Sequence, residues 1–183
     1  VSVDGRVKGA NRTAGVVGNF ADAGIISNSQ ATVKVHGIRF VGGITGFSEF
    51  NTTIEDSTSV SNIEGEEFAI GGVSGRNSGT IINSTSRSSV KGNYRVGGMV
   101  GDLSYGREGF NPEIIDSFSD SNVEGEMFVG SFVGYMGSVG AHSLEYTDEI
   151  NWETRIVDSY YTDKSGLDPI GRHNRGPVDL SKK

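Results

Sequence analysis

Two segments of the chain carry aromatic and charged residues in a combination that is typical of ligand-binding loops. They span residues 102–113 and 135–155 and are the longest stretches between recurring sequence blocks. Tyrosine, tryptophan and arginine are the residues that most often anchor a bound partner. We therefore expect a glycan or protein ligand to contact Tyr105, Arg107, Phe110, His142, Tyr146, Asp148, Glu149 and Trp152. The alternative is that both segments fold over the side of the molecule and bury Trp152 for stability.

No catalytic motif accompanies these residues. The sequence has no cysteine, and its histidines, His36, His142 and His173, are scattered and form no H-E-x-x-H zinc motif. Aspartate and glutamate are plentiful, and glycosidases use paired carboxylates, but the pattern singles out no pair. We predict that the chain is not an enzyme and holds no cofactor or catalytic metal.

Two further patterns could be mistaken for binding sites. Phosphate-binding loops place Lys-Ser/Thr after a G-x-x-G spacing, whereas Asp102 and Leu103 follow Gly101 here. A column of Asp and Asn residues could offer oxygen atoms to calcium, but hard cations need six or more of them. Asx side chains also satisfy N–H groups in turns, and we predict this role for the column, which comprises Asn28, Asp56, Asn83, Asp116 and Asp158.

Composition limits both the fold and the partners. Glycine makes up 28 of 183 residues and leucine is nearly absent, which favours an all-β protein because helices prefer leucine and disfavour glycine. The net charge of −7 argues against nucleic acid as a partner. No apolar run is long enough for a transmembrane helix, so we expect no direct membrane insertion.

An internal repeat must position the two segments. A glycine-rich block recurs as TAGVVGN (13–19), VGGITGF (41–47), IGGVSGR (70–76), VGGMVGD (96–102) and VGSFVGY (129–135). Each is followed by a block that ends in a serine, and these serines are Ser29, Ser57, Ser84, Ser117 and Ser159. A third block, V/I-x-G, completes the unit. Chance does not explain blocks that recur in the same order.

Glycines occupy two recurring positions in the first block. The earlier position holds Gly15, Gly43, Gly72 and Gly98, with Ser131 in the fifth copy, and we expect it at bends that exclude a Cβ atom. The later position holds Gly18, Gly46, Gly75, Gly101 and Gly134, and we expect it in turns.

Stacked repeats give the simplest architecture. Three apolar columns can point inward: Val16, Ile44, Val73, Met99 and Phe132; Ile26, Ile54, Ile81, Ile114 and Ile156; and Val7, Val35, Ile63, Val90 and Val123. They predict a parallel β-solenoid of about five three-strand rungs spaced about 4.8 Å apart. The units lie near 13–40, 41–69, 70–95, 96–128 and 129–159 within residues 1–159, and 160–183 is predicted to be a C-terminal cap or linker. Residues 102–113 and 135–155 should leave the same corner of consecutive rungs.

The stretches VGGMVGD…IIDS…VEG and IGGVSGRNSGTIINSTSRSSVKG resemble GLUG-motif repeats, over roughly residues 7–166. The family occurs in bacterial and archaeal surface adhesins and in N-terminal regions of immunoglobulin-A-protease-type zinc metallopeptidases. The resemblance implies a right-handed β-solenoid on an exported, cell-surface protein and implies no catalytic residues. The chain departs from the pattern at Ser131 and in the two long segments.

These observations predict a non-catalytic segment of an extracellular surface protein, which acts as a spacer and presents its long loops to a host or cell-surface glycan or protein. One alternative is an accessory, non-catalytic domain of a secreted zinc metalloprotease, and another is a filament subunit that associates end to end. Because the chain begins inside a partial unit, we expect a further rung, domain or subunit before it. A downstream H-E-x-x-H motif would favour the protease, and concentration-dependent fibres would favour the filament.

Overall fold

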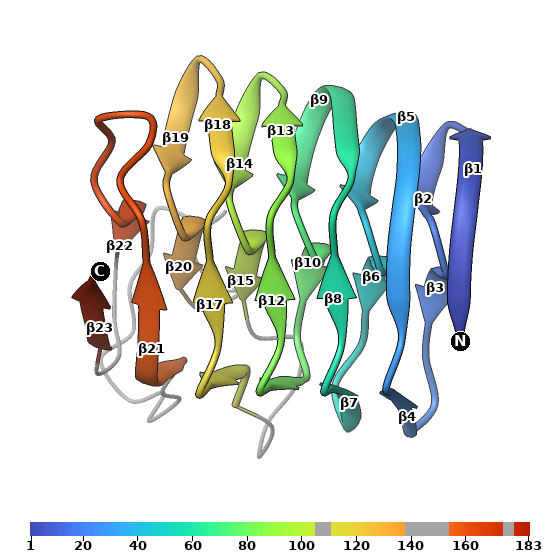
Figure 1. The fold of residues 1–183 in the computed structure, drawn as a ribbon, viewed down its shortest axis with the longest axis horizontal. Helices are drawn as coiled ribbons and strands as arrows, with labels where there is room; N and C mark the ends of the chain where they lie inside the picture. The colour runs from blue at the N-terminus through green and yellow to red at the C-terminus, as the bar shows by residue number, and fades with distance from the viewer. Residues whose placement is uncertain (105–110, 138–153, 174–177) are drawn as a thin grey trace, which may run out of the picture.

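The chain is a right-handed coil of parallel β-strands. A computed structural model describes residues 1–104, 111–137, 154–173 and 178–183. In Figure 1 the strands nearest the viewer rise, those behind them descend, and the coil advances from β1 towards β23, which gives it a right-handed sense. The predicted all-β, right-handed parallel β-solenoid is therefore confirmed. The described residues include no helix long and apolar enough to cross a membrane.

Successive coils repeat the same strands around the axis. Coil 1 contains β1 (Ser2–Lys8), β2 (Asn11–Ala14) and β3 (Val17–Phe20). Coil 2 contains β4 (Gly24–Ser27), β5 (Gln30–Gly42) and β6 (Thr45–Ser48). Coil 3 contains β7 (Thr52–Glu55), β8 (Thr58–Ser59), β9 (Asn62–Gly71) and β10 (Ser74–Asn77).

The later coils are divided more finely than the expected three strands. Coil 4 contains β11 (Thr80–Ile82), β12 (Thr85–Ser86), β13 (Ser89–Lys91), β14 (Tyr94–Gly97) and β15 (Val100–Ser104). Coil 5 contains β16 (Glu113–Ile115), β17 (Phe118–Ser119), β18 (Asn122–Glu124), β19 (Met127–Gly130) and β20 (Val133–Gly137). Coil 6 contains β21 (Arg155–Tyr161) and β22 (Ile170–His173), and β23 (Val178–Lys182) begins the next turn.

The three predicted apolar columns are in register. Ile26, Ile54, Ile81, Ile114 and Ile156 are consecutive Cα partners, as are Val7, Val35, Ile63, Val90 and Val123. The third column is joined by backbone hydrogen bonds from Val16 through Ile44, Val73 and Met99 to Phe132. Its last four members are fully buried. Burial of these columns fixes the register, because a shift of one residue would turn every apolar side chain outward.

The recurring serines form a buried hydrogen-bonded column at one corner. The backbone N–H of each of the first four donates to the serine Oγ of the next coil at 3.2 Å. Each hydroxyl donates in turn to the carbonyl two residues earlier, at 2.8–3.0 Å. The residue before each serine has a φ of 45–49°, in the left-handed region. Asn and Asp tolerate this region best, which agrees with the predicted turn role of their column.

The earlier glycine of each block is required by close packing. A Cβ atom on Gly43, Gly72 or Gly98 would lie less than 3.0 Å from a buried serine hydroxyl and from a carbonyl of the next coil. The next coil therefore rests directly on the glycine backbone. Ser131 occupies the equivalent position in coil 5, where its backbone N–H donates to the Asp168 carbonyl at 2.9 Å and its hydroxyl lies 3.3 Å from the same oxygen.

The later glycine lies in a strand and not in the predicted turn. Gly46, Gly75, Gly101 and Gly134 belong to β6, β10, β15 and β20. A Cβ atom on Gly46 would lie 2.7 Å from the Phe40 carbonyl, and the other three meet equivalent backbone atoms. These glycines are needed because two strands of the coil approach each other backbone to backbone, which bends the coil inward.

The tail continues the coil further than the sequence indicated. The predicted boundary between 159 and 160 falls inside β21, and β22 and β23 add parallel strands to the stack. Ile170 pairs with Val133 and Arg172 pairs with Tyr135. Gly171 meets the backbone of coil 5 as the other later glycines meet theirs. Residues 170–172 are thus a further copy of the end of the glycine block.

Replacement of Gly72 by Ala should destabilise the protein by about 3 kcal/mol or prevent folding, because a new Cβ atom meets rigid backbone as well as Ser86. Urea unfolding followed by circular dichroism measures the effect. The matched control is Ser131→Ala, in the same column where a Cβ is already accommodated, and it should cost at most about 1 kcal/mol. Equal losses for both variants would contradict this account of the column.

Asp120 links coil 5 to the tail and should make the protein sensitive to acid. Its carboxylate pairs with the Lys164 ammonium at 2.8 Å and accepts a hydrogen bond from the Thr162 hydroxyl, and these contacts lower the pKa of Asp120. A lowered pKa gives stability that is present above the ordinary aspartate pKa and is lost as pH falls through the folded-state value. Asp120→Asn should therefore lower the free energy of unfolding in urea at pH 7 by less than about 1 kcal/mol, and the difference should vanish in acid. The control is Asp4→Asn, at an exposed carboxylate in β1, which should leave the free energy of unfolding at pH 7 unchanged.

Candidate functional site

All eight predicted ligand-contacting residues lie outside the described residues. Tyr105, Arg107 and Phe110 fall in 105–110, and His142, Tyr146, Asp148, Glu149 and Trp152 fall in 138–153. Their predicted role stays a prediction.

The structure describes the residues at which the two segments leave and rejoin the coil, and these residues lie together in consecutive coils. Asp102 pairs with Tyr135 where the segments begin, Ser104 pairs with Gly137 two residues further on, and Glu113 pairs with Arg155 where the segments end. The Arg155 N–H donates to the Pro112 carbonyl at 3.0 Å. The prediction that both segments leave the same corner of consecutive coils is confirmed.

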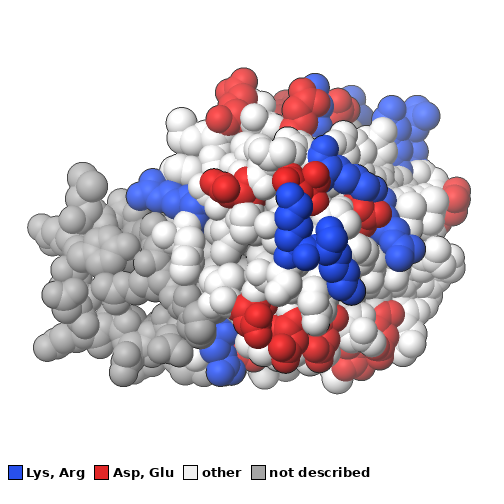
Figure 2. Space-filling model, turned by 60° about the vertical axis from the view of Figure 1, so that its left-hand side comes forward, with Lys and Arg blue, Asp and Glu red and all other residues white. Residues whose placement is uncertain are grey.

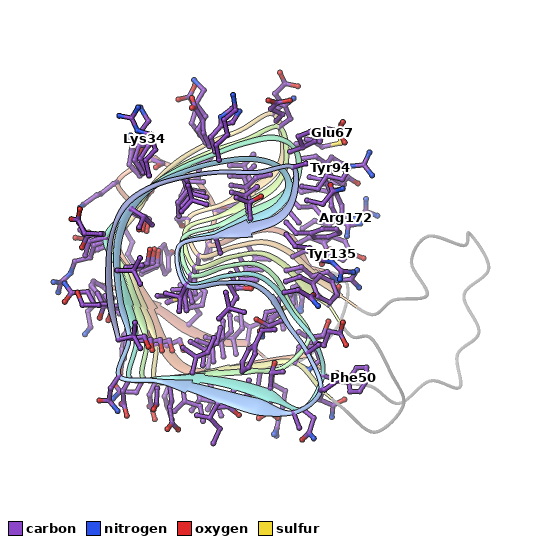
Figure 3. The ribbon with its side chains drawn as sticks, turned by 90° about the vertical axis from the view of Figure 1, so that its right-hand side faces the viewer. Lys34, Phe50, Glu67, Tyr94, Tyr135 and Arg172 are labelled. Carbon is purple, nitrogen blue, oxygen red and sulfur yellow. The ribbon has the colours of Figure 1, made fainter. Side chains whose placement is uncertain are left out.

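A second set of side chains lies beside these residues. In each coil the residue before the glycine block faces the last residue of the block, seven positions later, across the inward bend. The pairs, from coil 1 to coil 5, are Arg12–Asn19, Phe40–Phe47, Ala69–Arg76, Arg95–Asp102 and Phe128–Tyr135. The last members are in register along β3, β6, β10, β15 and β20, and Arg172 of β22 extends their row. Figure 3 shows Tyr94, Tyr135 and Arg172 on the side where the ribbon bends inward, opposite the wall that carries Lys34.

The first member of each pair has an unusual backbone. Arg12, Phe40, Ala69, Arg95 and Phe128 have φ values of 52–59°, a region that residues with a Cβ seldom adopt. The strand register skips these positions, since Asn11 pairs with Arg39 and Thr13 pairs with Val41. One residue is skipped on both paired strands, and its left-handed backbone gives its side chain a direction different from that of its neighbours in the strand. Here it turns each side chain across the bend towards its partner.

Aromatic rings connect the coils along this side. Phe40 lies edge-on to Phe68 at 5.4 Å between ring centroids, Phe68 stacks on Tyr94 at 5.8 Å, and Tyr94 is 5.0 Å from Phe128. Phe40 and Phe128 also contact Phe47 and Tyr135 across the bend, at 5.4 and 6.2 Å. We call this set the aromatic–arginine ladder; it comprises Arg12, Phe40, Phe47, Phe68, Arg76, Tyr94, Arg95, Asp102, Phe128, Tyr135 and Arg172.

A buried ion pair occupies the middle of the ladder. Arg95 Nη1 lies 2.6 Å from Asp102 Oδ2, and the two residues are only 6% and 1% exposed. The guanidinium carbon lies 4.8 Å from the ring centroid of Phe68 and 4.0 Å from that of Tyr135. Arg95 Nε and Asp102 Oδ1 are buried without a hydrogen-bond partner. Such atoms cost free energy, so this pair is not the arrangement that stability alone would favour.

Two other arginines share one ring at the start of the ladder. The guanidinium carbons of Arg12 and Arg76 lie 4.8 and 5.3 Å from the ring centroid of Phe47. Phe47 belongs to the coil between them. Within the described ranges neither arginine has a carboxylate partner, whereas Arg39 is paired with Glu67 at 2.5 Å. We call this arrangement the Arg12–Phe47–Arg76 clamp.

Acidic side chains gather elsewhere. Figure 2 shows Asp and Glu residues along the lower edge of the coil, with Lys and Arg residues on the wall above. In the Asx column at a corner of the coil, Asn83 Nδ2 donates to Asp56 Oδ1 at 2.5 Å. The described parts of the chain contain no group of three or more His, Asp or Glu residues placed to hold a metal ion.

Sequence reasoning missed the ladder because it stopped at the limits of the glycine block. The signal lies in the two flanking positions, which read R/N, F/F, A/R, R/D and F/Y from the first unit to the fifth. Four of these five combinations can form a hydrogen bond, a ring contact or an ion pair. The two positions are always seven residues apart, and their residue types change together from unit to unit. This pattern indicates that their side chains contact each other across a bend.

Comparison with known proteins identifies the fold. No protein-family model matches the chain, and no curated protein matches its sequence. A solved protein from Bacteroides ovatus, described as a "putative immunoglobulin A1 protease", has a similar structure, with a TM-score of 0.69 and 18% sequence identity. The match covers 98% of this chain and 60% of that one, so the chain spans little more than half the length of the protein that it resembles.

Removal of one partner of the buried pair should be far more damaging than removal of both. Asp102→Leu or Arg95→Met alone leaves a buried charge unpaired and should cost about 3–5 kcal/mol in urea unfolding. The double variant should recover most of that loss. The exposed pair Lys91–Glu124, 2.9 Å apart, is the control, and Lys91→Met should change the urea midpoint little. Additive losses in the double variant would contradict this account of the buried pair.

Proposed function

We propose that the chain is a non-catalytic, ligand-presenting solenoid of an extracellular protein. The observation that carries the proposal is that the ladder lies beside the points at which the two long segments leave the coil. Asp102 and Tyr135 are the first residues of the two long segments, and they lie in β15 and β20, which end at Ser104 and Gly137. One side of the molecule thus combines the aromatic–arginine ladder with the points at which both long segments leave the coil, and loops on one side of a repeat scaffold are common binding surfaces.

A binding role accounts for the ladder better than a purely structural one. The apolar columns already hold the coils together, yet the ladder adds non-glycine residues in the left-handed region and buried polar atoms without partners. Such costs are concentrated at functional sites. The absence of a catalytic motif in the sequence supports a module that binds without reacting.

We also propose that the module is an accessory region of a larger, protease-like polypeptide. The GLUG-like repeats favour such a setting, and so does the fold shared with part of the Bacteroides ovatus protein. In this setting the catalytic domain lies elsewhere in the polypeptide, and the solenoid holds a surface or substrate near it. The full-length gene tests this directly, because a downstream H-E-x-x-H motif is expected in a zinc protease.

Binding should depend on the aromatic residues of the long segments. We expect the chain to bind a glycan, a protein or whole cells in a broad screen, and the double variant Trp152→Ala/Tyr105→Ala to bind at least about tenfold more weakly, because aromatic anchors carry much of the energy of an interface. Biolayer interferometry on the recovered ligand measures the affinity, and thermal melting checks that the fold is intact.

Tyr160→Ala is the matched control, since Tyr160 is an exposed aromatic residue of β21, on the wall opposite the ladder. It should leave the affinity unchanged. Failure of the parent chain to bind anything in the screen would contradict the proposed function, and so would equal losses for Tyr160→Ala and the double variant.

A further inference from the structure

We propose that the Arg12–Phe47–Arg76 clamp binds an extended acidic polysaccharide that lies along the axis of the coil. The inference rests on the proposed function and specifies its ligand class. It concerns only described residues, in coils 1 to 3.

The first argument is charge. The chain as a whole is acidic, with a net charge of −7. Two other arginines are neutralised by carboxylates, Arg39 by Glu67 and Arg95 by Asp102. Arg12 and Arg76 have no carboxylate partner among the described residues, and Arg76 Nε is buried without a hydrogen-bond partner. This clamp is therefore a local cationic site that lacks a counter-ion, and a carboxylate or sulfate group on a ligand would supply one.

The second argument is geometry. Arg76 is half-buried and faces Ala69, whose methyl group is the smallest side chain at any of these positions. Arg12 donates to Asn19 Oδ1 at 3.0 Å, a contact that fixes its direction. Both guanidinium groups are also held against the ring of Phe47. Two oriented arginines two coils apart, about 10 Å along the axis, suit a repeating polymer whose acidic groups recur at that interval.

The third argument separates a polysaccharide from a peptide. Extended peptides gain much of their affinity from backbone hydrogen bonds to a free sheet edge. Along the ladder the strands run across the axis. The strands β5 and β6 pair with coils on both sides, and the one free edge, on β2 and β3 of coil 1, also runs across the axis. A peptide along the axis would find only side chains. Sugar hydroxyl and carboxylate groups bind through side chains, for which the guanidinium fork is well suited.

The test is calorimetric titration of the full 183-residue chain with three probes. These are polygalacturonate as the acidic polysaccharide, dextran as a neutral one, and poly-glutamate as an acidic peptide. We expect polygalacturonate to bind, with an affinity that falls as salt is raised, and dextran and poly-glutamate to bind at least about tenfold more weakly. Arg12→Ala and Arg76→Ala should each weaken polygalacturonate binding by about tenfold.

Two further variants separate the clamp from general effects. Arg6→Ala removes an exposed arginine of β1, outside the ladder, and should leave binding unchanged. Arg76→Lys keeps the charge but loses the planar fork, so its binding should fall between the parent and Arg76→Ala. Thermal melting of each variant shows whether the fold survives.

The outcomes distinguish this inference from the proposed function. Equal binding of dextran, or binding that Arg76→Ala and Arg6→Ala weaken alike, would overturn the clamp while leaving a ligand-binding solenoid intact. Tighter binding of poly-glutamate would assign the clamp to an acidic peptide and overturn the polysaccharide. No binding of polygalacturonate, together with a ligand recovered in the broad screen, overturns only this inference. No ligand in either experiment overturns both.

Discussion

The structure depends on backbone contacts that leave no room for a Cβ atom. At Gly43, Gly72 and Gly98 the next coil rests directly on the glycine backbone, and at Gly46 a strand approaches the carbonyl of Phe40. Because of these contacts, the coil bends inward between the first and the last residue of each glycine block. The inward bend then decides which side chains can meet, because it brings positions seven residues apart face to face. The ladder is thus a consequence of glycine packing as much as of its own contacts.

The ladder also shows how a repeat can present a different pair of side chains in each coil. The glycine contacts are the same in successive coils, so the flanking positions can vary without disturbing the stack. One coil pairs two phenylalanines, another pairs Arg95 with Asp102, and a third sets Arg76 opposite Ala69. Ring contacts between coils hold these different pairs in one continuous row. A constant backbone therefore supports a side whose charge and shape change along the axis.

Much of this architecture could be predicted from the sequence, because the interior obeys simple column rules. The isoleucine column from Ile26 to Ile156 is in register as its spacing predicted, and so is the column from Val7 to Val123. The later glycines were harder. A glycine beside a polar residue is commonly part of a turn, and only the approach of a second strand explains why Gly46 lies inside β6.

The side that carries the site was predicted only in part, for a physical reason. Column reasoning compares equivalent positions in different coils, and it correctly placed together the points at which the long segments leave the coil. The ladder instead depends on contacts between positions that are not equivalent, such as Arg95 with Asp102 and with Tyr135 of the next coil. These contacts exist only once the bend is known, and the bend follows from glycine packing that sequence spacing does not specify. In a solenoid the conserved spacing of the repeat therefore predicts the scaffold, while the binding surface is found by asking which variable positions the scaffold brings together.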